Sequence, residues 1–283
     1  MRASTVGTHA IRPAHRELLD RLENTGERDQ FDEVGRMSLQ GVVRGLMPRR
    51  LGGLTRLATE SLTYPVDFSD RDVALHKRVA AFTMTSAERV AALADACRYI
   101  SRRKIEGDFV ECGVWRGGSS MAAALTLLDA EDVRELFLFD TYTGMTPPSA
   151  KDRAHSGEPA ESVLERSERN RCIADEADVA ANLASTGYPG ERVHLIKGDV
   201  LETIPVSAPP TIALLRLDTD FYESTRHELA HLYPRLSSGG VLIIDDYGHW
   251  QGARQAVDEY FSTLPNAPLL ARIDYTGRLA VKP

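Results

Sequence analysis

Long apolar runs are absent from this chain of 283 residues. No stretch approaches the roughly 18 apolar residues that a membrane-spanning helix needs, so we expect no membrane partner. The first residues, Met1 to Gly7, lack the apolar block of a secretory signal, which favours a cytoplasmic location. The formal charge of −7 argues against a nucleic-acid partner, because binding a phosphate backbone calls for a concentrated basic surface.

Cysteine is scarce, and one common glycine motif is missing. The three cysteines, Cys97, Cys112 and Cys172, are an odd number and lack the spacing of a metal site. We therefore expect reduced thiols, with Cys112 packed inside a buried strand. The chain also has no Gly-x-Gly-x-x-Gly turn after its first predicted strand, which counts against a dinucleotide-dependent dehydrogenase.

The apolar pattern divides the chain into two parts. Residues 1–80 show helical spacing, from Arg16 to Leu22 and more weakly from Phe31 to Met47, and predict an N-terminal helical arm. Such an arm would either cover the sheet or join two subunits, and we expect a homo-oligomer. Residues 81–283 predict one large α/β domain, with an early helix from about Ser86 to Ile100 that Ser86 caps.

Five apolar runs alternate with longer segments, which is typical of parallel strands joined by right-handed crossovers. Leu269–Ile273 and Leu279–Val281 predict a closing antiparallel hairpin. This pattern resembles the class I S-adenosylmethionine-dependent methyltransferase fold, a Rossmann-like α/β sheet, although a dinucleotide-binding sheet has the same pattern. Residues 143–178 predict a surface excursion or lid. The five runs are Phe109–Cys112, Leu136–Phe139, Val193–Ile196, Ile212–Leu217 and Val241–Ile244.

Three aspartates follow two of these predicted strands. Asp218 comes directly after one strand, and the pair Asp245 and Asp246 comes after another. Neighbouring parallel strands would bring all three to the same edge of the sheet, where carboxylate oxygens suit magnesium or another hard divalent cation. The alternative is structural: Asp218 and Asp246 would be helix N-caps and Asp245 a turn residue.

A glycine-containing turn follows the first predicted strand, from Val110 to Ser120. Glycines such as Gly113 let the backbone approach a ligand, and the N-terminus of the following helix offers N–H groups to a carboxylate or phosphate. The acidic Glu111 just before the turn favours a ligand site over a tight turn that binds nothing. The resemblance to the methyltransferase fold implies that this pocket would hold the carboxylate of a methionine moiety.

Acidic residues also follow the second and third predicted strands. Asp140 ends the second strand about 20 residues after the glycines, where its side chain can accept hydrogen bonds from ribose hydroxyls. The alternative for Asp140 is an N-cap or an Asx-turn with Thr141. Asp199 would lie near an adenine, although Gly198-Asp199 is also ordinary turn chemistry.

Several motifs together make the chain similar to the macrocin O-methyltransferase (TylF) family, over about Phe82 to Tyr260. The resemblance implies a metal-dependent enzyme that methylates a sugar hydroxyl on a glycosylated natural product. The motifs are Phe82-Thr83-Met84-Thr85, Glu111-Cys112-Gly113-Val114-Trp115-Arg116-Gly117-Gly118-Ser119, Leu215-Arg216-Leu217-Asp218, Tyr222-Glu223-Ser224-Thr225, Leu232-Tyr233-Pro234, Asp245-Asp246-Tyr247-Gly248 and Gly252-Ala253-Arg254.

The resemblance also implies a role for each site residue. Asp218, Asp245 and Asp246 would bind Mg2+, with Asp218 as the base. S-adenosylmethionine would be held by Glu111, Ser119 and Asp140, with Met84 lining its pocket. Two departures concern the same site: the family often has Gly-Trp-Phe at Gly198-Asp199-Val200, and it often has glycine at Thr219.

The predicted reaction is metal-assisted methyl transfer to a sugar oxygen. A carboxylate alone is a weak base for a sugar hydroxyl, so a cation would do most of the acidifying. His249, close after Asp246, is an alternative base. The nearest rival function is an O-methyltransferase for catechols or other phenols, and the more distant rivals are a nucleotide-dependent oxidoreductase and a scaffold that binds the cofactor without turnover.

Overall fold

The computed structural model describes residues 64–283. Most of the predicted arm at 1–80, including both of its apolar patterns, lies outside these residues. The described end of that segment contains helix α4 (Asp70–Val79), which Ser69 caps by accepting from the backbone N–H of Asp72. Within residues 64–283, no helix is long and apolar enough to cross a membrane.

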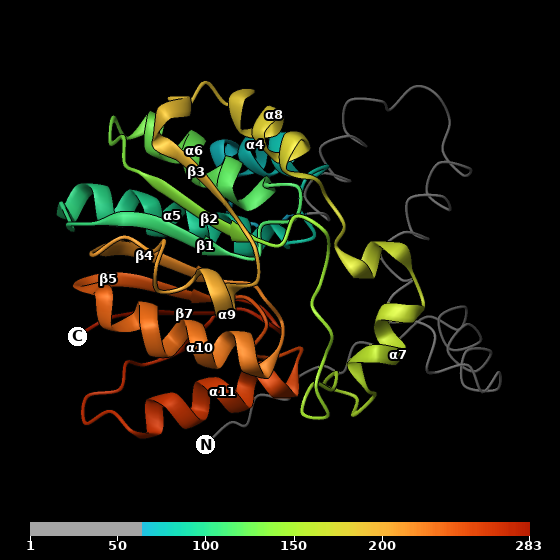
Figure 1. Cartoon of the computed structure of the whole chain (residues 1–283). Coiled ribbons are helices and arrows are strands. Elements are labelled where there is room, and N and C mark those ends of the chain that lie inside the picture. Colours follow the sequence, from blue (N-terminus) through green and yellow to red (C-terminus); the bar gives the residue numbers. More distant parts are fainter. Residues whose placement is uncertain (1–63) are drawn as a thin grey trace, which may run out of the picture. The chain divides into compact units, whose positions relative to one another are not determined.

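The centre of the domain is a seven-stranded sheet in the order β3-β2-β1-β4-β5-β7-β6 (Figure 1). β1 to β5 run parallel, while β7 pairs antiparallel with β5 and with β6. The predicted parallel sheet and its closing hairpin are therefore confirmed. The strands are β1 (Asp108–Cys112), β2 (Leu136–Asp140), β3 (Val193–Lys197), β4 (Ile212–Leu217), β5 (Leu236–Ile244), β6 (Ala271–Arg272) and β7 (Arg278–Val281).

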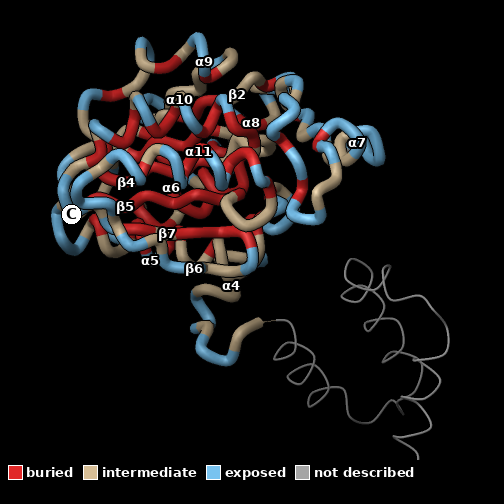
Figure 2. Tube along the Cα trace, turned by 90° about the horizontal axis from the view of Figure 1, so that it is seen from below, coloured by how far each residue is buried: buried red, intermediate tan, exposed pale blue. Residues whose placement is uncertain are grey.

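Helices cover both faces of the sheet, so the central strands are buried on each side (Figures 1 and 2). Alternate strand residues enter opposite cores: Phe109 packs in the core beneath α5 and α6, and Val110 packs in the core beneath α10 and α11. The helices are α5 (Ala87–Arg103), α6 (Gly118–Asp129), α7 (Ala160–Glu165), α8 (Glu176–Ala184), α9 (Val200–Thr203), α10 (Tyr222–Leu232) and α11 (Gln251–Ser262), with short 3-10 turns at Glu168–Arg171, Gly190–Arg192 and Tyr233–Arg235.

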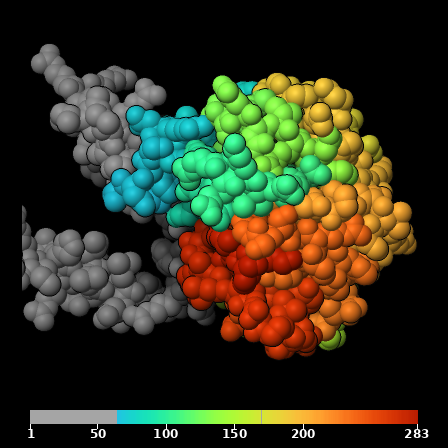
Figure 3. All heavy atoms as spheres, turned by 90° about the vertical axis from the view of Figure 1, so that its left-hand side faces the viewer, coloured from blue at the N-terminus to red at the C-terminus, as the bar shows by residue number. Residues whose placement is uncertain are grey.

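Helix α5 confirms the early helix predicted from the sequence. The side chain of Ser86 accepts a hydrogen bond from the backbone N–H of Arg89 and caps the helix, as expected. The predicted apolar face, which includes Leu93 and Cys97, is buried. On the face that Figure 3 presents, the residues after α5 meet C-terminal elements, and the hydroxyl of Ser237 donates to the carbonyl of Glu106 at 2.8 Å.

Residues 143–178, the predicted excursion, run from the end of β2 to α8 and include α7, which lies beyond the edge of the sheet (Figure 1). Asp152 anchors this segment, because its buried carboxylate accepts from the backbone N–H of Tyr222, the first residue of α10, at 2.8 Å. A bridge between Ala154 and Trp250 and a bond from the N–H of Gln251 to the carbonyl of Arg153 add backbone contacts. The segment is thus attached directly to the residues around the ends of β4 and β5.

Gly113 permits a close approach between the ends of β1 and β4. Its φ is +83°, and a Cβ at this position would lie 2.0 Å from the carbonyl oxygen of Asp218. Gly187 has a similar φ of +80°, but a Cβ there would meet nothing within 4 Å. An alanine at Gly187 would therefore be strained only by its positive φ, whereas an alanine at Gly113 would also collide with the backbone.

We predict that Gly113→Ala lowers the free energy of unfolding by about 3 kcal/mol or more, whereas Gly187→Ala lowers it by about 1 kcal/mol. Only the first variant must displace the backbone of β4 in addition to holding alanine at a positive φ. Urea unfolding of both variants measures the difference. Equal losses would mean that the contact between Gly113 and Asp218 is not rigid.

Candidate active site

Three aspartates meet at the carboxyl ends of β4 and β5. One carboxylate oxygen from each of Asp218, Asp220 and Asp246 lies within 4.8 Å of the others. The strand pairing explains this, because Leu217 at the end of β4 is the partner of Ile244 at the end of β5. The expected meeting of carboxylates at this edge of the sheet therefore includes two of the three predicted residues, Asp218 and Asp246.

The structural alternative for Asp218 and Asp246 is wrong, because neither residue caps a helix. The residues that immediately precede α10 and α11 are Phe221 and Trp250, and neither of these side chains caps its helix. Both aspartates instead lie in the turns between a strand end and the following helix. Neither carboxylate is therefore used to cap a helix.

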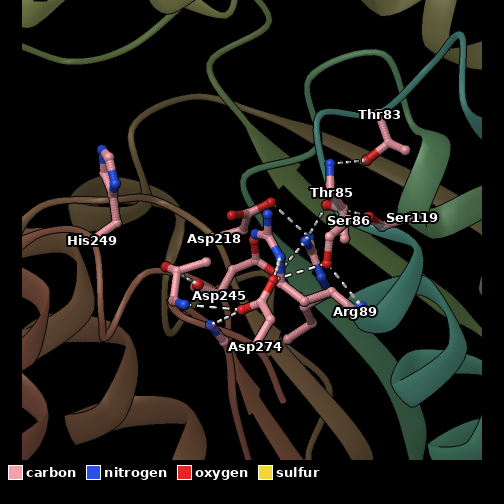
Figure 4. Close-up of polar contacts among 12 residues, drawn as sticks. Thr83, Thr85, Ser86, Arg89, Ser119, Asp218, Asp245, His249 and Asp274 are labelled. Atoms are coloured by element: carbon pink, nitrogen blue, oxygen red, sulfur yellow. Dashed lines mark hydrogen bonds and ion pairs between the residues drawn. The ribbon is translucent and has the colours of Figure 1, made fainter. Parts of the chain in front are cut away.

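Asp245, the third predicted ligand, lies outside this cluster. Its Oδ1 accepts from Nη2 of Arg216 at 2.7 Å, and its Oδ2 accepts from Nη1 of Arg89 (Figure 4). Both of its oxygens are thus bonded to arginine, and the side chain is buried. The grouping of Asp245 with Asp218 and Asp246 is not the arrangement in the structure.

Strand alternation is the physical reason. Ile243 packs in the core on the α5 side of the sheet, and Ile244 packs in the core on the α10 side. If this alternation continues past the strand end, Asp245 faces α5 and Asp246 faces the opposite side. Asp220, which the sequence analysis did not single out, lies in the third place of the cluster.

Arg216 of β4 connects the strand ends from within the sheet. Its side chain is 2% exposed, and its Nη1 lies 2.5 Å from Oε1 of Glu111 and 2.8 Å from Oδ2 of Asp218. Its Nη2 donates to Asp245 at 2.7 Å and to the hydroxyl of Thr85 at 3.1 Å. One guanidinium group thus orients carboxylates from three neighbouring strands.

Arg89 of α5 extends the same network toward the closing hairpin. Besides Asp245, it contacts Asp274, whose Oδ2 lies 3.0 Å from Nε of the arginine. The hydroxyl of Ser86 donates to the same Asp274 oxygen at 2.8 Å (Figure 4). Helix α5, β5 and the turn between β6 and β7 are therefore held together by paired charges.

Burial changes the protonation of the acidic cluster. It raises the pKa of Asp220 to about 7, and burial together with the charge of Asp220 raises the pKa of Asp246 well above its usual range. Among residues 64–283, Oδ2 of Asp246 is a buried oxygen without a hydrogen-bond partner. Hard oxygen donors, excess negative charge and an orphaned acceptor all fit a divalent cation bound by Asp218, Asp220 and Asp246.

The loop after β1 lies beside Asp140, as expected from the sequence. The carboxylate of Asp140 accepts from the backbone N–H groups of Val114 at 2.7 Å and Trp115 at 3.0 Å, so it shapes this loop. It also accepts from the N–H of Tyr142 at 2.8 Å, which confirms the Asx-turn that was the alternative for this residue. A contact between Asp140 and ribose stays a prediction.

The other predicted cofactor residues surround the same loop. Ser119 is buried at the start of α6, with its hydroxyl 3.4 Å from that of Thr85. The N-cap of α6 is Gly117, which has no side chain to bond the first N–H groups. Met84 is 42% exposed, an unusual state for a large apolar side chain, and its contact with a cofactor stays a prediction.

Two predicted residues have structural partners of their own. Glu111 bonds both Arg216 and the hydroxyl of Ser120. Asp199 is the N-cap of α9, where its side chain accepts from the N–H of Leu201 at 2.9 Å. Cofactor contacts by Glu111 and Asp199 therefore stay predictions.

His249 follows Asp246 but lies apart from Asp218 (Figure 4). Its Nδ1 is 3.2 Å from the hydroxyl of Tyr275, and its ring centre is 5.5 Å from that of His155 in the excursion. His249 thus lies within a group of rings from three separate segments, with His155 and Tyr275. Its role as the base stays a prediction.

Solved structures with the same architecture define the class of this protein. The O-methyltransferase NovP matches with a TM-score of 0.63 and 30% identity, covering 71% of this chain and 82% of NovP. The calicheamicin methyltransferase CalS11 matches with a TM-score of 0.56 and 18% identity, covering 76% of this chain and 94% of CalS11. The domain has the class I S-adenosylmethionine-dependent methyltransferase fold, as the sequence predicted.

The sequence comparisons identify the family. A model of the macrocin-O-methyltransferase (TylF) family matches residues 50–280, and the chain belongs to this family of O-methyltransferases. It is 34% identical over 200 residues to demethyldecarbamoylnovobiocin O-methyltransferase of Streptomyces niveus, covering 70% of this chain and 74% of that protein. It is also 33% identical over 199 residues to 8-demethyl-8-(2,3-dimethoxy-alpha-L-rhamnosyl)-tetracenomycin-C 4'-O-methyltransferase of Streptomyces olivaceus, covering 70% and 74%.

The buried Glu111 generates a testable pH dependence. Burial raises its pKa from the ordinary 4.5 to about 7, against the opposing charge of Arg216. Between these values the folded protein keeps a proton that the unfolded chain has released, so its contribution to stability is lost as the pH rises through about 7. This loss amounts to about 3 kcal/mol.

We predict that Glu111→Gln flattens the decline of the unfolding free energy between about pH 4.5 and pH 7. Urea unfolding in the presence of a chelator, at several pH values, measures the slope for the wild type and the variant. Glu202→Gln, on the exposed side of α9, is the control. Identical slopes for Glu111→Gln and the wild type would contradict the assignment.

Proposed function

We propose that this chain transfers the methyl group of S-adenosylmethionine to a hydroxyl of a sugar, on a glycosylated natural product or an oligosaccharide, and that it requires Mg2+. The observation that carries the proposal is the cluster of Asp218, Asp220 and Asp246 at the carboxyl edge of the sheet. The family membership supports methyl transfer to an oxygen atom. In the proposal, the cluster binds a cation beside the acceptor.

The names of the relatives support a sugar acceptor. The tetracenomycin enzyme carries a rhamnosyl group in the name of its substrate, and its methylated position is 4'. A further relative, mycinamicin III 3''-O-methyltransferase of Micromonospora griseorubida, is 34% identical over 199 residues, covering 70% of this chain and 77% of that protein. These activities belong to those proteins, and we extend the sugar class to this chain as part of the proposal.

Asp218, Asp220 and Asp246 would hold the cation. When bound there, Mg2+ would acidify an acceptor hydroxyl and fix its position. Arg216 keeps Asp218 in place through the 2.8 Å contact, and the turn from Thr219 to Phe221 presents Asp220. We assign proton acceptance to Asp220, because Oδ2 of Asp218 is engaged by Arg216 and Asp246 is the more buried residue.

The loop between β1 and α6 would hold the cofactor. S-adenosylmethionine supplies a methyl group on a positively charged sulfur, which needs no further activation. The open N-terminus of α6 suits the methionine carboxylate, and Asp140 at the end of β2 suits the ribose hydroxyls. Met84 would cover the ligand from the segment before α5, and Ser119 would line the pocket.

We predict that Asp246→Asn lowers the rate of methyl transfer at least about 100-fold, and that chelation of divalent cations does the same to the wild type. The loss of one carboxylate charge weakens cation binding without removing side-chain volume. Formation of S-adenosylhomocysteine on a panel of glycosides, with and without Mg2+, measures both effects. Asp67→Asn, on the surface before α4, is the matched control.

Four outcomes would change the proposal. Full activity in the chelator would show that the reaction does not require a cation. Turnover confined to catechols would show that the acceptor is a phenol and not a sugar. Among ligand variants, Asp220→Asn should lower kcat more than Asp218→Asn does. The reverse order would return the base to Asp218, and equal activity of both with loss in a His249→Gln variant would assign it to His249.

Four further properties complete the proposal. We place the enzyme in the cytoplasm and expect a homo-oligomer, with residues 1–80 forming an arm and residues 81–283 the methyltransferase domain. The acceptor is expected to bind beneath residues 143–178, because Asp152 ties this segment to the start of α10 beside the acidic cluster.

A further inference from the structure

Glu228 of α10 is a fully buried carboxyl group that the site described above does not use. Its side chain is 0% exposed, and its Oε1 accepts from the hydroxyl of Thr219 at 2.9 Å. Its Oε2 is buried and has no hydrogen-bond partner among the described residues. Burying a carboxyl group without full hydrogen bonding costs free energy. The presence of Glu228 at a position where an apolar side chain would fit therefore needs a physical reason.

The partner of Glu228 lies in the turn that carries the acidic cluster. Thr219 stands between Asp218 and Asp220, and its carbonyl accepts from the backbone N–H of Phe221 at 2.7 Å. Asp220 at the centre of this turn has a φ of +67°, a conformation that costs an ordinary residue about 1–2 kcal/mol. The turn therefore needs contacts that hold it in this shape.

We propose that Glu228 is a positioning residue, which fixes the hydroxyl of Thr219 and thereby holds Asp218 and Asp220 in the geometry that receives the cation. The contact ties the turn to the second half of α10, whose position is set by the packing of Leu229 and Leu232. The hydroxyl of Ser224 adds a second, longer bond to the Thr219 carbonyl at 3.3 Å. This inference rests on the proposed cation site.

The charges around Glu228 agree with this role. Asp218, Asp199 and Asp220 are the acidic groups that act on it, and Cys112 of β1 lies within its electrostatic reach. Burial raises the pKa of Glu228 to about 8, so the group adds little negative charge beside the cluster at neutral pH. A neutral glutamine should therefore keep the positioning role of Glu228, whereas leucine should lose it.

The test uses two matched pairs of full-length variants and Mn2+ alone as the probe. Thr219→Val and Glu228→Leu remove the hydrogen bond, while Thr219→Ser and Glu228→Gln keep it. We expect calorimetry to give about tenfold weaker Mn2+ binding for the first two variants and a change below about threefold for the second two. Amide exchange at Phe221, measured without metal, should accelerate about tenfold only in the first two.

Each result decides a different point. Wild-type Mn2+ binding and Phe221 exchange in Thr219→Val would overturn the role of Glu228 while leaving the cation site in place. No Mn2+ binding by the wild type would overturn the cation site, and the role of Glu228 would fail with it. If Glu228→Leu does not fold, the Thr219 pair carries the test, because the serine variant should restore what the valine variant loses.

Discussion

The buried guanidinium group of Arg216 is the constraint on which the site depends. Removing a charge from water costs several kcal/mol, and the structure offsets this cost with contacts to Glu111, Asp218 and Asp245. Those carboxylates come from the ends of β1, β4 and β5, so one side chain fixes three strand ends at once. Arg89 and Asp274 continue the pairing toward the final hairpin.

This constraint divides the acidic residues by function. Both carboxylate oxygens of Asp245 are bonded to arginine, so this residue supports the framework. Asp220 and Asp246 share a site, and among the described contacts neither is bonded to a basic side chain. The raised pKa of Asp220 is the electrostatic sign of that shortage, since burial and the charge of Asp218 outweigh the opposing charge of Arg89. The proposed cation would supply the missing positive charge.

Much of this arrangement could be predicted from the sequence. The apolar runs and their spacing predicted the parallel sheet, and Ser86 predicted the start of α5, because these signals are local in the sequence. Side-chain alternation separates Asp245 from Asp246 but does not predict the cluster, because Leu217 packs on the α10 side and the same rule would place Asp218 with Asp245. Contacts such as Arg89 with Asp274, which are 185 residues apart, depend on tertiary packing and leave no local signal.

The central claim is that Asp218, Asp220 and Asp246, and not Asp245, surround the cation. The most direct measurement is anomalous diffraction at the manganese edge from crystals of the protein grown with Mn2+ and S-adenosylhomocysteine. The account predicts one strong peak within about 2.0–2.6 Å of an oxygen from each of these three aspartates, with Asp245 still bonded to Arg216. A peak coordinated by Asp245, or no peak at this edge of the sheet, would contradict it.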